Sequence, residues 1–444
     1  MKVQEFMDRL LRAAGENGID PAEIYYTDAD SFSAKAQNTE IDSYEVSASC
    51  SLSIRGSVNG KMGYASTEAF DEEALAYLIR AVKESAALNE AEEQDEIFVG
   101  DESYPEVGTE EDDLDGVTAE EKLQMALTAE KAAREADPRI KQSEGATIRT
   151  SVRRAVLRNT YGLKLDNSQK LYVAYVLPIA KDGDATATGF KMKYGRKLRE
   201  LDPIRLGQEA AEDAVSQLHA EPVASGEYRT IIRHDAMQSL LSTFAGIFSA
   251  ENAQQKMSLL AGREGEEIAS TKVSITDDPL RKGGLATAPF DGEGSATYTK
   301  AVVENGVLKT LLHNRRTAKK QGVKTTGNAR RAGGMHVAPT NFYLEPGEKT
   351  LEEMLRDMGD GLLVTDVSGL HAGANPISGD FSLLAKGFVI RGGRQAEPVE
   401  RITVAGNFYQ LLKTIRAVGC DLEFPGSPIG SPSVDAGIMA VSGK

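Results

Sequence analysis

The segment IIRHDAMQSLLSTF, residues 231–244, places His234 and Asp235 at the start of an amphipathic helix pattern. A histidine followed by an acid on a helix begins the arrangement by which many metallopeptidases hold zinc and activate water. No second histidine follows in residues 235–244. Three interpretations are open at this point: a degraded metal site, an active site of another kind, or an ordinary helix start.

The ordinary interpretation has direct support in the pattern. Apolar residues recur on one helical stripe after His234, and Asp235 suits the positive end of a helix dipole and can cap free N–H groups. The stripe consists of Met237, Leu240, Leu241, Phe244, Ile247 and Phe248. The helix is therefore expected to be buried along that stripe whether or not its first residues carry chemistry.

A second group of polar residues lies in VSGLHAGANPISGDFS, residues 367–382. His371 stands there near Ser368, and a Ser-His-Asp arrangement would need a geometry that closeness in sequence does not supply. No G-x-S-x-G nucleophile elbow occurs in the chain. We therefore predict a turn-rich loop, with a stand-alone non-metal hydrolase around His371 as the alternative. As a loop it offers Asn375, Ser378 and Asp380 as candidate contacts for a peptide or partner.

Charge is distributed in two separate segments of opposite sign. The net charge is −16, yet residues 90–121 hold 15 acids and no Lys or Arg, which leaves −16 + 15 = −1 for the rest. We predict that this acidic stretch is a solvated linker or surface loop. Between Asn305 and Leu344 there is instead no acid and a series of cations: Lys309, Arg315, Arg316, Lys319, Lys320, Lys324, Arg330 and Arg331.

That basic segment is typical of a solvated helix face, and anionic substrates, carboxylate-bearing peptides or nucleic acid are its functional alternatives. Aromatic residues are absent from it until Phe342 and Tyr343. Base stacking is poorly supported for that reason, and nucleic acid is the weakest of these alternatives.

The elements that must position these residues fall into two regions. Residues 1–221 predict a helix, several strands and a closing helix, and then repeat that order. The expected helices are 3–17, 70–88, 118–136 and 203–218. The expected strands are 22–29, 44–56, 61–66, 142–158, 161–176 and 185–195. The Asn59-Gly60 pair predicts a tight hairpin.

From about residue 222 the sequence becomes rich in strands and glycine, with helices expected at 235–249 and 350–359. Hairpins are predicted at Asn305-Gly306 and Gly392-Gly393. The fold class is thus α+β with two domains, 1–221 and 222–444. The first is a pseudo-repeated helix/strand region containing the acidic segment, and the second is β-rich with a few helices.

Length and composition limit the class of protein. The 444 residues, 41% of them hydrophobic, can build two or three packed domains, and no apolar run approaches the roughly 18 residues of a membrane span. The N-terminus lacks the apolar region of a secretory signal, so a cytoplasmic protein is expected. Cys50 and Cys420 allow no disulfide framework, and both are expected to be buried.

The C-terminal half resembles the TldD/PmbA family, a metalloprotease-related family linked to modulation of DNA gyrase. The resemblance rests on ordered blocks over most of residues 225–444 and on a similar N-terminal plan. After the helix at 234–248, the blocks are AVVENGVLKTLLHNRRTAKKQG, TTGNARRAGG (325–334), NPISGDFSLLAKGFVI (375–390), PVERITVAGN (398–407) and VGCDL (418–422).

In the catalytic branch of that family, the helix carries His-Glu-x-x-x-His and a later Cys completes a zinc site. Mapped onto this chain, the first His is His234 and the Glu is Asp235. The second His is Ser239, and the Cys falls near Ser431. A catalytic zinc normally has three protein ligands, and Ser hydroxyls bind it poorly. Asp235 is also shorter than Glu by one methylene, about 1.5 Å.

This loss implies the PmbA or TldE-like branch, a non-catalytic subunit that pairs with a zinc-containing TldD-like subunit in peptide proteolysis or maturation. The resemblance then places zinc in the partner and no cofactor in this chain, with a homodimer possible in isolation. Asn328, Arg330 and Arg331 of TGNARR become candidates for holding a substrate carboxylate or an acidic partner surface. Besides the hydrolase around His371, the alternative function is a binding protein that modulates gyrase without proteolysis.

Overall fold

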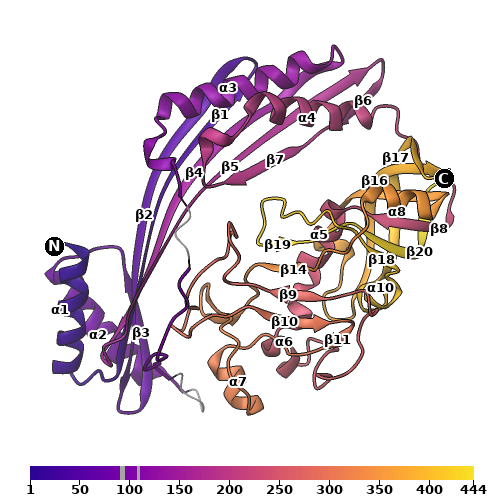
Figure 1. The fold of residues 1–444 in the computed structure, drawn as a ribbon. Coiled ribbons are helices and arrows are strands. Elements are labelled where there is room, and N and C mark those ends of the chain that lie inside the picture. The colour runs from indigo at the N-terminus through magenta and orange to yellow at the C-terminus, as the bar shows by residue number, and fades with distance from the viewer. Residues whose placement is uncertain (91–95, 108–110) are drawn as a thin grey trace.

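A computed structural model describes residues 1–90, 96–107 and 111–444. Within these residues the N-terminal region is one seven-stranded antiparallel sheet, in the order β3-β2-β1-β4-β5-β6, with β7 also paired to β5. Its strands are β1 (Ala22–Gln37), β2 (Glu40–Val58), β3 (Lys61–Thr67), β4 (Ile140–Asn159), β5 (Lys164–Asp182), β6 (Ala185–Thr188) and β7 (Lys191–Gly195). The long strands arch over the C-terminal region (Figure 1).

Two helix pairs cover the outer face of this sheet at its two ends (Figure 1). The pairs are α1 (Val3–Glu16) with α2 (Glu72–Leu88), and α3 (Ala119–Ala136) with α4 (Pro203–Ser216). Alanines line the contact of α3 with α4, and a Cβ on Gly207 would lie 2.3 Å from the carbonyl oxygen of Ala129. The repeated helix and strand plan therefore builds a single sheet with a main core under each helix pair and a smaller cluster under the end of α4.

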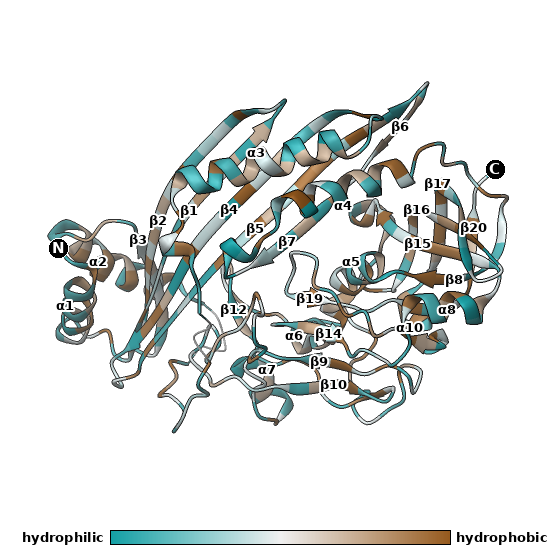
Figure 2. Ribbon diagram, turned by 45° about the horizontal axis from the view of Figure 1, so that its top comes forward, coloured by the Kyte–Doolittle hydropathy of each residue, from teal (hydrophilic) through white to brown (hydrophobic). Residues whose placement is uncertain are grey.

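The strands behave as half-buried antiparallel strands should. Hydropathy changes between apolar and polar along their length (Figure 2), and burial alternates along β5. The Asn59-Gly60 hairpin is confirmed, because both residues adopt positive φ angles, 52° and 82°. β1 is longer than the expected strand at 22–29, since its second half pairs with β2 and β4 through to Ala36.

The C-terminal region contains two main sheets. In the first, β17-β16-β15-β8-β20-β18, the pairing of β17 with β20 closes a barrel. Its strands are β8 (Gly226–Ile232), β15 (Gly361–Ser368), β16 (Asp380–Arg391), β17 (Arg394–Asn407), β18 (Ala417–Val418) and β20 (Val434–Ser442). The second, β11-β10-β9-β14-β19, consists of β9 (Ile275–Asp277), β10 (Lys300–Glu304), β11 (Val307–Leu308), β14 (Phe342–Leu344) and β19 (Ile429–Gly430).

The expected α5 and α8 (Leu351–Met358) are present, and α5 is shorter than predicted, running from His234 to Phe244 before a 3-10 turn at Ala245–Phe248. The structure also has the short helices α6 (Ala250–Gln254), α9 (Leu370–Gly373) and α10 (Phe408–Thr414), which the sequence did not predict. A further helix, α7 (Arg315–Gln321), lies in the basic segment, where a solvated helix face was expected. All four are short, at four to seven residues, so their apolar period is hard to distinguish from that of a strand.

The hairpins at Asn305-Gly306, between β10 and β11, and at Gly392-Gly393, between β16 and β17, are confirmed.

Among the described residues, no helix is long and apolar enough to cross a membrane. The expected burial of the cysteines was wrong for Cys420, which is exposed, while Cys50 is half-buried.

The acidic segment lies within the N-terminal region and contacts the C-terminal region. Of this segment, residues 91–95 and 108–110 lie outside the described residues. Ile97 and Phe98 are buried, and the Arg315 guanidinium lies 3.9 Å from the centre of the Phe98 ring. Glu96 pairs with Lys319 at 2.5 Å. Residues 96–98 are therefore not a solvated linker, because they pack against the basic segment of the C-terminal region.

The loop FDGEGS, residues 290–295, is a turn, and it faces the same junction. The Tyr104 hydroxyl donates to the Gly294 carbonyl at 2.8 Å, and Asp101 accepts the Ala296 N–H at 2.7 Å. Asp291 in the turn is buried and accepts N–H groups from Glu293, Ser295 and Ala329. Burial, together with the charge of Glu293, raises the pKa of Asp291 to about 7.

This raised pKa predicts a pH-dependent stability. A carboxyl that binds its proton more tightly in the folded state contributes stability at low pH, and that stability is lost as the pH rises through about 7. We expect wild type to lose about 1 kcal/mol relative to Asp291→Asn between pH 6 and pH 8. Urea unfolding of both proteins at the two pH values measures this. A difference that is the same at both would contradict the prediction.

Candidate functional site

His234 begins α5 directly after β8. Its ring is half-buried, with Nδ1 3.1 Å from an oxygen of Asp235. The other Asp235 oxygen accepts the Arg233 Nε hydrogen at 2.8 Å. Burial would raise the pKa of Asp235, but the adjacent His234 ring and the charge of Arg233 outweigh it and lower the pKa to about 2. Asp235 is thus an ionised carboxylate held between two cationic or polar neighbours.

The expected capping by Asp235 was wrong. The N-cap position is Arg233, no side chain of α5 caps it, and Asp235 lies in the first turn. The cap is supplied from the far end of the chain, because the Ser433 hydroxyl accepts the His234 N–H at 3.1 Å and donates to Asp421 at 2.6 Å. No local sequence signal identifies this contact, since 199 residues separate its partners.

Ser431, which stands near the expected position of the thiol, follows β19, and β19 packs against α5. Its side chain is fully buried, and its hydroxyl donates to the Pro432 carbonyl at 2.8 Å. Ser239 lies one turn after Asp235 on α5. In the mapping that the family resemblance predicts, two ligand positions therefore carry hydroxyl groups.

These residues do not fit a zinc ion. The set offers one imidazole, a carboxylate already paired with a guanidinium, and hydroxyls that are weak zinc ligands. Arg233 would also bring a positive charge next to the cation. Elsewhere in the described ranges, no group of three His, Cys, Asp or Glu side chains could hold a metal ion.

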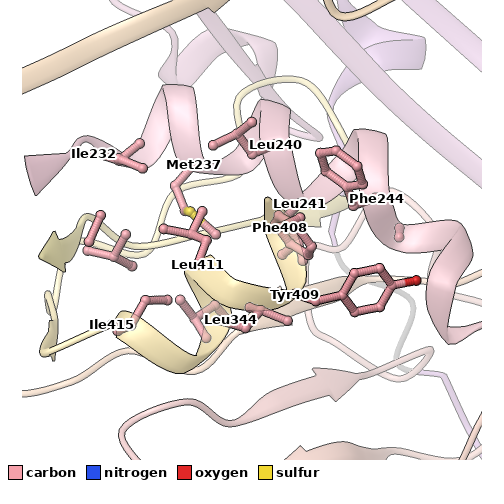
Figure 3. Packing of buried hydrophobic residues seen from close by; sticks show 14 of the residues in the cluster. Ile232, Met237, Leu240, Leu241, Phe244, Leu344, Phe408, Tyr409, Leu411 and Ile415 are labelled. Atoms are coloured by element: carbon pink, nitrogen blue, oxygen red, sulfur yellow. The ribbon is translucent and has the colours of Figure 1, made fainter. Parts of the chain in front are cut away.

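The rest of α5 is structural, as its pattern predicted. Met237, Leu240, Leu241 and Phe244 are buried, and the Phe244 ring stacks on Phe408 of α10 with centroids 4.6 Å apart. Figure 3 shows this packing between α5 and α10. Burial of such side chains contributes about 1.5–3 kcal/mol each, which explains why the helix persists without metal chemistry.

The TGNARR residues have different surroundings. Asn328 is buried at 1% exposure. Its side-chain N–H groups donate to Asp277 and to the Ala338 carbonyl, and its side-chain oxygen accepts a hydrogen bond from Lys300. Arg331 forms an ion pair with Glu23 of β1, donates to the Gly292 carbonyl at 2.7 Å and lies over the Tyr25 ring. Asn328 and Arg331 therefore stabilise the fold and the junction of the two regions. Arg330, on β12 (Ala329–Arg331), is exposed and stays a predicted contact.

Within the 367–382 segment, residues 374–379 between α9 and β16 form the turn that the sequence predicted. The Asn375 side chain accepts the N–H groups of Ile377 and Ser378, and the Ser378 hydroxyl donates to Asp380 at 2.8 Å. Hydrogen bonds from Asn407 and Ser378 lower the pKa of Asp380. His371 is exposed on α9, and none of its described contacts is a hydrogen bond to a serine or acid. Asn375, Ser378 and Asp380 stay candidate peptide or partner contacts.

Comparison with known families places the chain among the metallopeptidase-related proteins. Three family models match it, named for the PmbA/TldA metallopeptidase: domain 1 at residues 22–86, the central domain at 112–218 and the C-terminal domain at 225–443. The chain belongs to the PmbA/TldD family. We retain two domains with a boundary near residue 222 as a proposal.

Its relatives carry PmbA names. The chain is 31% identical to the metalloprotease PmbA homolog of Haemophilus influenzae, covering 95% of this chain and 92% of that protein. It is 26% identical to metalloprotease PmbA of Escherichia coli O157:H7, covering 91% and 88%.

Among solved structures, a Thermotoga maritima protein described as a proposed modulator of a DNA gyrase shares 34% identity and a TM-score of 0.92, covering 99% and 100% of the two chains. TldE from Thermococcus kodakarensis shares the fold, with 24% identity, a TM-score of 0.89 and the same coverage. The PmbA names of its relatives confirm the PmbA-like branch that the sequence predicted.

Proposed function

We propose that this chain is a non-catalytic PmbA/TldE-like subunit that pairs with a zinc-containing TldD-like subunit in peptide proteolysis or maturation. The observation that carries the proposal is the α5 site, where the Asp235 carboxylate is paired with the Arg233 guanidinium. In the mapping from the family resemblance, hydroxyls of Ser239 and Ser431 stand where zinc ligands are expected. The PmbA names of the relatives and the TldE fold support the same branch. Zinc then resides in the partner, and this chain contributes structure and peptide contacts.

The test is co-expression with the TldD-like protein of the same genome. We expect a stable complex that cleaves an unfolded peptide, whereas this chain alone has no activity and holds fewer than about 0.1 zinc ions per chain. Replacing His234 by alanine should leave turnover by the complex within about twofold of wild type, since His234 is not a ligand. A matched change of the first zinc-binding histidine in the partner should abolish turnover.

Other outcomes would favour the other functions. Stoichiometric zinc in the isolated chain would contradict the proposal. Chelator-resistant peptidase activity of this chain alone, lost in His371→Ala, would indicate the non-metal hydrolase. Retention of biological function after mutation of the partner's zinc ligands would favour a binding protein that modulates gyrase without proteolysis.

A further inference from the structure

A pocket of about 870 Å³ lies between the N-terminal sheet and the C-terminal region. One wall is formed by the end of β7 and the residues after it, and the opposite wall by the loop at 280–287. The volume is in the range of sites that bind small ligands or short peptide ends. It is separate from the α5 site, because neither α5 nor Ser431 lines it.

Arg281 on the loop wall is held in a fixed orientation. Its guanidinium lies 4.5 Å from the centre of the Phe424 ring and 5.0 Å from that of Tyr343, and these rings pack edge to face. Stacking of this kind fixes the plane of the guanidinium and leaves its edge N–H groups able to donate. An oriented guanidinium is the preferred donor for a carboxylate, which it binds through two parallel hydrogen bonds.

In the described part of the chain, the lysine on the sheet wall of the pocket is paired with acids, whereas the cations on the loop wall are not. Lys197 pairs with both acids of the lining, Glu111 at 3.4 Å and Glu200 at 3.5 Å. Throughout the described residues, by contrast, Arg281 and Lys282 form no ion pair with an acid. Lys282 is exposed next to Arg281. The loop wall therefore presents two adjacent positive charges that an anionic group can neutralise.

The sheet wall supplies a hydrogen-bond donor and apolar surface. Burial raises the pKa of Tyr194 to about 12, so its hydroxyl keeps its proton at neutral pH. Tyr194 shares a strand face with Met192, which packs against Gly426 of the C-terminal region. Leu280 and Val107 add apolar surface to the lining. A ligand with one anionic end and an apolar side chain matches this combination.

We propose that this pocket binds the C-terminal carboxylate of a peptide, with Arg281 and Lys282 pairing with the carboxylate and Leu280 and Tyr194 contacting the adjacent side chain. The proposal rests on the peptide role proposed above and identifies the part of the peptide that this subunit holds. Arg281 is also better placed to bind the carboxylate than Arg331, because the Arg331 guanidinium already forms an ion pair with Glu23. Nucleic acid fits less well, because Glu111 and Glu200 line the same pocket.

Fluorescence anisotropy with the purified full chain tests this directly. The probes are fluorescein-labelled Ala-Ala-Phe with a free carboxylate and the same tripeptide as a C-terminal amide. We expect the wild-type chain to bind the free acid at least about tenfold more tightly than the amide. Arg281→Met keeps the aliphatic stem against the rings and should weaken binding of the acid about tenfold, without affecting the amide.

Lys282→Ala removes an exposed charge without disturbing packing and should weaken binding of the acid by about threefold. Lys320→Ala is the matched control, because it removes an exposed lysine of the basic segment outside the pocket. It should bind both probes as wild type does. Equal affinity for the two probes, no detectable binding of the acid, or an equal loss in the Lys320 variant would overturn the proposal.

A twelve-nucleotide single strand that displaces the acid probe more effectively than unlabelled Ala-Ala-Phe would also overturn the proposal. The readout uses this chain alone, so it does not depend on zinc or on the partner. If the chain binds the free acid specifically but does not pair with the TldD-like protein, only the subunit role is rejected. Normal pairing and turnover without such binding would reject the pocket only.

Discussion

Replacing Lys300 by methionine is expected to lower the free energy of unfolding by about 3–5 kcal/mol. Lys300 and Asp277 are both buried, and the ammonium lies 2.8 Å from a carboxylate oxygen. Methionine fills a similar volume and leaves the carboxylate of Asp277 without a cation in a site that water does not reach. Urea unfolding at pH 7, followed by circular dichroism, measures the loss.

The position of this pair explains the size of the effect. Asp277 ends β9, the strand between β10 and β14, and it also accepts hydrogen bonds from Asn328 and Thr340. The Asp277 carboxylate thus connects the sheet β11-β10-β9-β14-β19 to the segment that carries TGNARR. Losing its cation affects all of these contacts together, because they share one buried charge.

Two further variants separate charge from packing. Lys309→Met removes a half-exposed lysine paired with Glu304 at 3.3 Å and should leave stability nearly unchanged. The double variant Lys300→Met with Asp277→Asn removes both charges and should recover part of the loss. A Lys300→Met protein as stable as wild type would show that the pair contributes nothing to folding.

The sequence predicted those features that depend on residues close together in the chain. The apolar stripe of α5 and the Asn-Gly turns are determined by spacings of a few residues, so pattern alone was sufficient. The assignment of Ser239 and Ser431 to zinc-ligand positions comes from the family resemblance and stays a prediction. The short helices α6 and α10 were missed because five and seven residues give fewer than two helical periods.

The features that could not be predicted depend on contacts between distant segments. Arg331 and Glu23 are 308 positions apart, and Ser433 reaches His234 across 199. In sequence Arg331 is simply one of many cations, and only the fold distinguishes it from exposed Arg330. The same holds for Arg281, which lies outside the basic segment and gains its orientation from Tyr343 and Phe424.

Glu23→Gln is expected to destabilise the protein by about 3 kcal/mol and to weaken the contact between its two regions. The Glu23 side chain is fully buried on β1, where it accepts the Arg55 Nε hydrogen at 2.8 Å and pairs with Arg331 from the C-terminal region. Glutamine keeps the shape but removes the negative charge that these two guanidinium groups share. Thermal and urea unfolding measure the stability.

The comparison with other variants isolates the contact between the regions. Arg331→Met should cost less than Glu23→Gln, because Arg55 still pairs with Glu23 when Arg331 is removed. Coupling between the two changes in a double-mutant cycle should exceed about 1 kcal/mol, since the side chains are in direct contact. Glu72→Gln, which breaks the exposed pair with Arg9, is the control and should have little effect.

Proteolysis supplies a second readout that a purely local defect would not change. The segment at 96–107 is tied to the C-terminal region through Phe98, Asp101 and Tyr104, so weakening the junction should expose it. We expect faster cleavage there in Glu23→Gln than in wild type or Glu72→Gln at the same temperature. Wild-type cleavage rates despite a lower unfolding free energy would place the role of Glu23 within the N-terminal sheet alone, through Arg55.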